Sequence, residues 1–106
     1  RGLMHRTDDI LLLATDGFSD NVWNRELEQI ITLILKEDAA LPSLQLAEKV
    51  AASCCHYARV CSFKQNKESP FEVEARQHNL NFRGGKVDDV CVIAVVVKGA
   101  VRESKL

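Results

Sequence analysis

Blocks of apolar and polar residues along this chain predict strands near its two ends and helices between them. The run Ile10–Ala14 is apolar and stops abruptly at Thr15-Asp16-Gly17, and a second apolar run lies within Val87–Val97. Short apolar runs bounded by charged and turn-forming residues are typical of strands that are buried on both faces. We therefore expect one buried strand in each of these two places.

The residues between the two runs show helical periodicity. One apolar stripe repeats at intervals of three and four residues and is formed by Leu27, Ile30, Ile31, Ile34 and Leu35. A second amphipathic segment covers about 44–58, a short helix is possible at 71–78, and the polar stretch 61–70 reads as a loop. The resulting order, strand–helix–helix–loop–strand, predicts an α+β unit in which both long helices pack on one face of a sheet.

Acidic residues stand at opposite ends of the two predicted strands. Asp16 follows the first apolar run, whereas Asp88 and Asp89 precede the second. If the strands are antiparallel neighbours about 4.8 Å apart, these acids fall at the same edge of the sheet, within reach of one shared cation. Gly17, directly after the first acid, permits a sharp turn and the close approach of a ligand.

Composition sets limits on the class of protein. The 106 residues carry a net charge of −1, which gives no electrostatic case for binding nucleic acid. The longest apolar run, Val90–Val97, is far shorter than the roughly 20 residues of a membrane-spanning helix. No cysteine pair has zinc-knuckle spacing, and reduced, mostly buried thiols fit an intracellular compartment. The length suits one domain or part of one.

Two strands alone rarely form an independently stable sheet. The remaining strands would come from sequence preceding Arg1, from a partner chain or from a dimer, and we favour preceding sequence. We therefore expect the chain to be part of a larger domain.

The strand-end acids suit a divalent metal ion. Carboxylate oxygens are hard ligands that favour Mg²⁺ or Mn²⁺, and a water bound to such an ion is a nucleophile near neutral pH. Phosphate is a natural target, because the cation also offsets charge on the phosphoryl oxygens. Asp-Gly and Asp-Asp pairs are also common turn residues. The spacing alone leaves both interpretations open.

Two motifs resemble a known family. The segment ATDGFSDNV, residues 14–22, is similar to the xxDGxxD segment of the metal-dependent (type 2C) protein serine/threonine phosphatases. GGKVDDVCVIAVVV, residues 84–97, resembles their Asp-Asp or Asp-Asn segment and terminal strand. The stretch 69–89, SPFEVEARQHNLNFRGGKVDD, is similar to the subgroup related to mitochondrial type 2C phosphatases. The resemblance covers about 8–97.

The resemblance implies a four-layer αββα fold, in which helices flank a sandwich of two antiparallel β-sheets with two or more Mg²⁺ or Mn²⁺ ions at one end. By position, Asp16 and Asp88 match metal ligands of the catalytic centre. Asp20 matches an acid that acts through water or on a more weakly held third cation, although a helix N-cap would also explain it. Asp89 matches a residue that supports the ligands rather than binding the metal.

The implied activity is hydrolysis of phosphoserine and phosphothreonine in proteins by a metal-activated water, with a phosphoprotein as the partner. The family's first half, with its own acidic ligands and phosphate-binding Arg, has no counterpart in residues 1–106. We therefore expect this chain to be the C-terminal part of a single phosphatase domain and to be inactive alone. The alternatives are a non-catalytic phosphatase-like module that binds a partner, and a structural fragment without a site.

The last three residues, Ser104-Lys105-Leu106, match a peroxisomal import signal. If Leu106 is the native C-terminus, we expect import into peroxisomes or related organelles such as glycosomes. The subgroup resemblance favours mitochondria instead, and both locations remain open.

Overall fold

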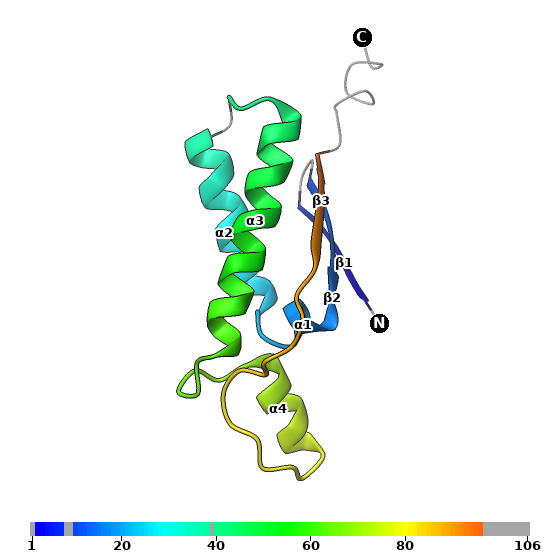
Figure 1. Ribbon diagram of the computed structural model, residues 1–106, viewed down its shortest axis with the longest axis vertical. Coiled ribbons are helices and arrows are strands. Elements are labelled where there is room, and N and C mark those ends of the chain that lie inside the picture. Colours follow the sequence, from blue (N-terminus) through cyan, green and yellow to red (C-terminus); the bar gives the residue numbers. More distant parts are fainter. Residues whose placement is uncertain (1, 8–9, 39, 97–106) are drawn as a thin grey trace.

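The computed structural model of this chain describes residues 2–7, 10–38 and 40–96 (Figure 1). Asp8, Asp9 and the C-terminal Ser104-Lys105-Leu106 lie outside the described residues. The predicted α+β class is confirmed. In chain order the elements are β1 (Gly2–Thr7), β2 (Ile10–Thr15), α1 (Asp16–Ser19), α2 (Asn24–Asp38), α3 (Ser43–Ser62), α4 (Pro70–Gln77) and β3 (Val92–Val96). Within the described ranges, no helix is long and apolar enough to cross a bilayer.

The strands form one antiparallel sheet in the order β1-β2-β3. The predicted pairing of the two apolar runs is confirmed, since Ile10 pairs with Val96 and Ala14 pairs with Val92. The expectation of only two strands was wrong, because Gly2–Thr7 pairs with β2 along its whole length. Strand pairing uses backbone groups, and this mostly polar segment carries little of the apolar pattern by which strands are recognised.

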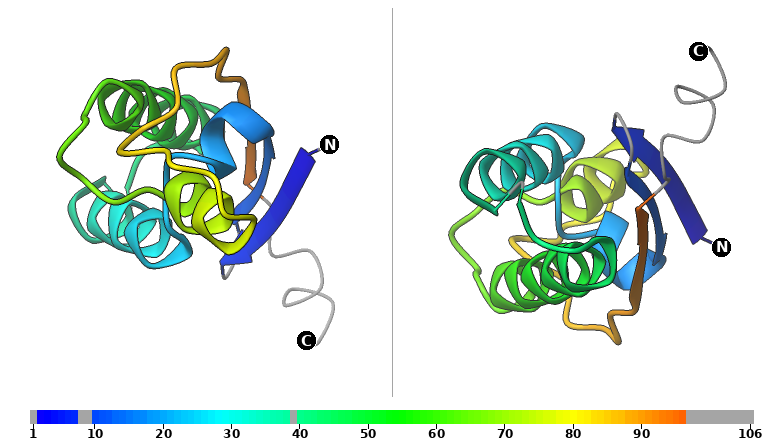
Figure 2. Two further views of the ribbon diagram at one scale, coloured as in Figure 1. Left: turned by 90° about the horizontal axis from the view of Figure 1, so that it is seen from below. Right: turned by 90° about the horizontal axis from the view of Figure 1, so that it is seen from above.

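Helices α2 and α3 cover one face of the sheet, as predicted (Figures 1 and 2). Alternate residues of β2, namely Ile10, Leu12 and Ala14, turn their side chains toward these helices and are almost fully buried. The core between sheet and helices also contains Leu27, Ile31, Ile34, Leu46, Val50, Cys54 and Ala58. The amphipathic stripes read from the sequence are therefore the surfaces that hold the helices to the sheet.

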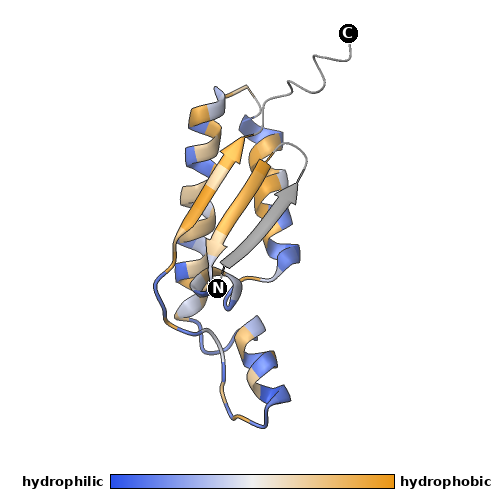
Figure 3. Ribbon diagram, turned by 90° about the vertical axis from the view of Figure 1, so that its right-hand side faces the viewer, coloured by the Kyte–Doolittle hydropathy of each residue, from blue (hydrophilic) through white to orange (hydrophobic). Residues whose placement is uncertain are grey.

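The opposite face of β2 and β3 is apolar and open (Figure 3). The exposed fractions are 47% for Leu13, 52% for Ile93 and 47% for Val95. The expectation that both strands are buried on both faces was therefore wrong for the described residues, in which the long helices lie on one side only. That further strands cover this face stays a prediction.

A half-buried carboxylate, that of Glu26 near the start of α2, ties three elements together. Its oxygens accept hydrogen bonds from the Tyr57 hydroxyl of α3 and the Trp23 N–H, and Lys67 Nζ lies 2.9 Å away in the loop before α4. Burial alone would raise the pKa of Glu26. The hydrogen bonds from Tyr57 and Trp23, with the hydrogen bond and charge of Lys67, outweigh it, so this pKa lies below its ordinary value of 4.5.

We expect Glu26→Gln to reduce the free energy of unfolding by about 1–3 kcal/mol at neutral pH, because charged hydrogen bonds are lost. A carboxyl whose pKa is lowered by folding stabilises the fold above its unfolded pKa and stops doing so as the pH falls through its folded pKa. The difference in free energy of unfolding between wild type and Glu26→Gln should therefore have its full size above about pH 4.5 and disappear at lower pH. Urea unfolding across this range measures it, with Glu37→Gln on the same helix as control. A difference that persists unchanged into strong acid would contradict the expectation.

Candidate functional site

The edge of the sheet where β2 ends carries the first predicted site residue. Asp16 is the first residue of the one-turn helix α1, where the sequence predicted only a turn. The Thr15 N–H donates to the Cys91 carbonyl at 3.0 Å, and the Cys91 N–H donates to Thr15 Oγ1 at 3.1 Å. The antiparallel pairing of β2 with β3 therefore includes Cys91, the residue just before β3, and reaches the point where α1 begins.

The backbone of α1 touches the segment that carries the second acid pair. A Cβ atom built on Gly17 would lie 2.0 Å from the carbonyl oxygen of Asp89, so only glycine allows this approach. The predicted topology is thus confirmed, because Asp16 and the Asp88-Asp89 pair belong to adjoining backbone segments at one edge. Gly17 admits a neighbouring backbone rather than a ligand. The metal-binding roles of these acids stay predictions.

Asp88 and Asp89 lie in a segment without regular secondary structure, just before β3, and are both exposed. The predicted second strand, 87–97, begins in the structure only at Val92. The Asp89 N–H donates to Asp88 Oδ1 at 2.8 Å, so the first carboxylate is oriented by the backbone of the residue that follows it. Both carboxylates can be reached from solvent.

Asp20 lies at the C-terminal end of α1 and is buried. Its Oδ2 lies 3.7 Å from Lys86 Nζ, and its N–H donates to the carbonyl of Asp16 at 2.8 Å. The alternative that Asp20 caps the following helix is wrong, because α2 begins only at Asn24. Asp20 therefore belongs to the same edge as Asp16 and carries a cationic neighbour there.

Asn21 lies at this edge and was not among the residues predicted for the site. Its side chain is fully buried, and Nδ2 donates to the carbonyls of Gly17 at 2.7 Å and Lys86 at 2.8 Å. Its Oδ1 accepts from the Lys86 N–H at 2.7 Å. A carboxamide can donate to the C=O and accept from the N–H of one residue at the same time, whereas an ionised carboxylate can only accept. An Asn in a predicted turn gives no sign in the sequence of a partner 65 positions away.

A second set of bonds holds the same loop two residues earlier. Ser69 Oγ donates to the Gly84 carbonyl at 2.6 Å, and the Gly84 N–H donates to Glu72 Oε1 at 2.7 Å. Gly84 has a positive φ of 78°, and a Cβ on Gly85 would lie 2.0 Å from the carbonyl oxygen of Cys61. The glycine pair is therefore a tight, packed connection.

The donor set fits Mg²⁺ or Mn²⁺ in kind, since the acids at this edge offer carboxylate oxygens. It does not make a complete site. Among the described residues, no three His, Cys, Asp or Glu side chains come close enough together to hold a metal ion. A cation here would therefore need ligands besides the carboxylates of this edge.

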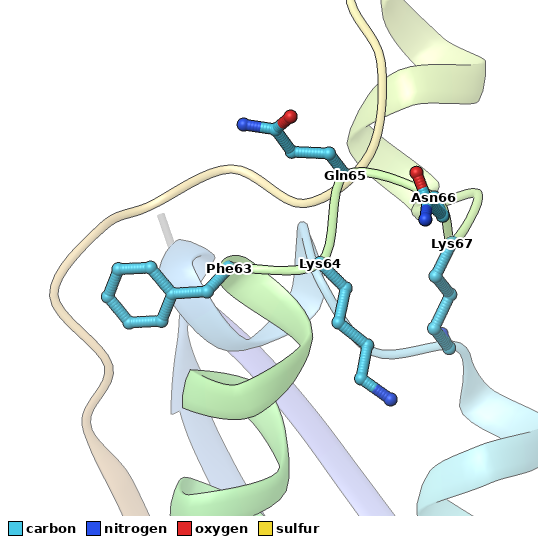
Figure 4. A pocket seen from close by; sticks show the side chains of 5 residues that line it. All are labelled: Phe63, Lys64, Gln65, Asn66 and Lys67. Carbon is cyan, nitrogen blue, oxygen red and sulfur yellow. The ribbon is translucent and has the colours of Figure 1, made fainter.

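A hollow lies in the loop after α3 and is lined by Phe63, Lys64, Gln65, Asn66 and Lys67 (Figure 4). The side chains of Lys64 and Lys67 lean toward the same side, while Phe63 points away from them. Lys67 pairs with Glu26. The lining contains none of the predicted site acids, so this hollow is not the predicted metal site.

Comparison with known proteins finds similarity to protein phosphatases, although no model of a known protein family matches the chain. It is 30% identical over 97 residues to "Probable protein phosphatase 2C 55" of Arabidopsis thaliana, which covers 92% of this chain and 20% of that protein. It is 40% identical over 91 residues to "Protein phosphatase PTC7 homolog fig" of Drosophila erecta, covering 85% of this chain and 27% of the relative.

A solved structure agrees with these relatives. The X-ray structure of the photosystem II phosphatase PBCP matches with a TM-score of 0.64 and 25% sequence identity, covering 84% of this chain and 36% of that one. The chain thus spans between a fifth and a third of the length of the two curated relatives and little more than a third of the solved structure.

Proposed function

Because the chain belongs to the type 2C family of protein phosphatases and corresponds to the C-terminal part of their domain, we propose that it contributes to metal-dependent hydrolysis of phosphoserine and phosphothreonine in proteins. The observation that supports this most is the common edge. Antiparallel pairing of β2 and β3, continued by the Thr15–Cys91 bonds, brings the segments of Asp16 and Asp88 together.

The role of this chain in the reaction is to bind and orient. Asp16 and Asp88 would hold Mg²⁺ or Mn²⁺, and the cation would supply positive charge against the phosphoryl oxygens and lower the pKa of a coordinated water. Asp89 fixes the preceding carboxylate through its N–H. Asp20 adds negative charge at the same edge, balanced by Lys86 at 3.7 Å.

The chain needs further ligands to do this chemistry. We propose that residues outside this chain complete the metal site and the sandwich, either from the same domain or from a partner chain. The exposed apolar face formed by Leu13, Ile93 and Val95 supports this, because such a surface is normally covered in a stable domain. Alone, the chain would bind metal weakly and turn over no phosphopeptide.

The test is turnover of phosphoserine and phosphothreonine peptides by the complete domain with and without Mn²⁺. We expect release of phosphate that requires Mn²⁺ or Mg²⁺ and stops on addition of a chelator, and none from residues 1–106 alone. Metal binding without turnover would favour the non-catalytic module. Turnover by the isolated chain would contradict the claim that its site is incomplete.

A further inference from the structure

Asn21 joins the two acid-bearing segments from inside the fold. Its three hydrogen bonds reach Gly17 on one segment and both backbone groups of Lys86 on the other, 65 positions further along the chain, at 2.7–2.8 Å. We propose that Asn21 is a positioning residue, which fixes the separation of Asp16 and Asp88 and thereby tunes metal binding. This inference rests on the proposed function.

Asn21 is a stronger link than the neighbouring ion pair. Lys86 Nζ and Asp20 Oδ2 are 3.7 Å apart, and the lysine side chain is 37% exposed, so solvent screens this attraction. The Asn21 bonds are shorter, and this side chain is fully buried. Removing it would leave the buried Gly17 carbonyl and the two part-buried backbone groups of Lys86 without this partner, and the cost is greatest for the buried carbonyl.

The position of these bonds makes them relevant to the metal site rather than to the fold alone. Gly17 directly follows Asp16, and Lys86 precedes Asp88 by two residues. The loop is already anchored further back, where Ser69 and Glu72 hold Gly84. Loss of Asn21 would therefore release the end of the loop that carries the acid while the earlier anchor remains.

The experiment measures Mn²⁺ binding directly, by calorimetry on the complete domain, for wild type, Asn21→Ala and Asn21→Ser. We expect Asn21→Ala to weaken Mn²⁺ binding about 10–100-fold, as loss of groups that orient metal ligands usually does. Asn21→Ser, which keeps one hydroxyl, should lie between Asn21→Ala and wild type. Tyr57→Phe is the matched control, because it removes a hydrogen bond in the Glu26 network and should not change Mn²⁺ affinity.

Two outcomes separate the inference from the function on which it rests. Wild-type affinity in a folded Asn21→Ala protein would overturn the positioning role, whereas failure of the wild-type domain to bind Mn²⁺ would overturn the proposed function and this role together. Amide hydrogen exchange in the wild type needs no variant. The Lys86 N–H should exchange as slowly as the core of α3, and rapid exchange would overturn the inference.

Discussion

Asp16→Asn in the complete domain is expected to lower Mn²⁺-dependent phosphatase activity by at least about 100-fold, since even groups that only orient metal ligands are worth 10–100-fold. The substitution keeps the shape of the side chain and removes its charge, so it tests the carboxylate rather than the packing. The Mn²⁺ concentration for half-maximal binding, measured by calorimetry, should be higher in Asp16→Asn than in wild type. Asp88→Asn should behave similarly, because it supplies the other proposed ligand.

Asp38→Asn is the matched control for this experiment. Asp38 ends α2 at the opposite end of the helix from the site and pairs with Lys49 Nζ at 2.5 Å (Figure 1). Loss of this exposed pair should cost no more than about 1 kcal/mol of stability and should leave Mn²⁺ binding unchanged. Equal Mn²⁺ affinity in Asp16→Asn and wild type would remove Asp16 from the metal site.

The elements that could be predicted are those whose own sequence carries the apolar pattern that the fold buries. Five consecutive apolar residues predict β2. An apolar stripe predicts α2 and includes Leu27 and Ile31, which have no exposed surface. β1 could not be read in this way, because Gly2–Thr7 is held through backbone pairing with β2. The open face of the sheet was also missed, because continuous apolar runs look alike whether one face is covered or two.

The candidate site also has one part that could be predicted from the sequence and one part that could not. The shared edge of Asp16 and Asp88 followed from strand direction and sequence order, which are local properties combined with one assumption about topology. Asn21 could not be recognised, since its partner Lys86 lies far away in sequence and only the folded chain brings them together. A polar side chain in a turn looks the same in sequence whether it caps a helix or bonds a distant loop.

Gly17→Ala is the second substitution with a large expected effect. The new Cβ would meet the Asp89 carbonyl oxygen at 2.0 Å, and this is a backbone atom that cannot rotate away. The acid-bearing segment must then move as a whole, which pulls against the Thr15–Cys91 bonds. We expect the free energy of unfolding to fall by about 3 kcal/mol, the upper end of the usual cost of overpacking.

The same displacement should weaken Mn²⁺ binding in the complete domain, because it separates Asp16 from Asp88. Urea unfolding and calorimetric Mn²⁺ titration measure the two effects independently. Ser19→Ala is the control in the same short helix, since its Oγ makes only a long 3.4 Å bond to the Asp16 carbonyl and its loss should cost within about 0.5 kcal/mol. If Gly17→Ala were as stable as Ser19→Ala, the close packing of α1 against Asp89 would be refuted. If it were unstable but bound Mn²⁺ normally, that packing would support the fold without setting the distance between the two acids.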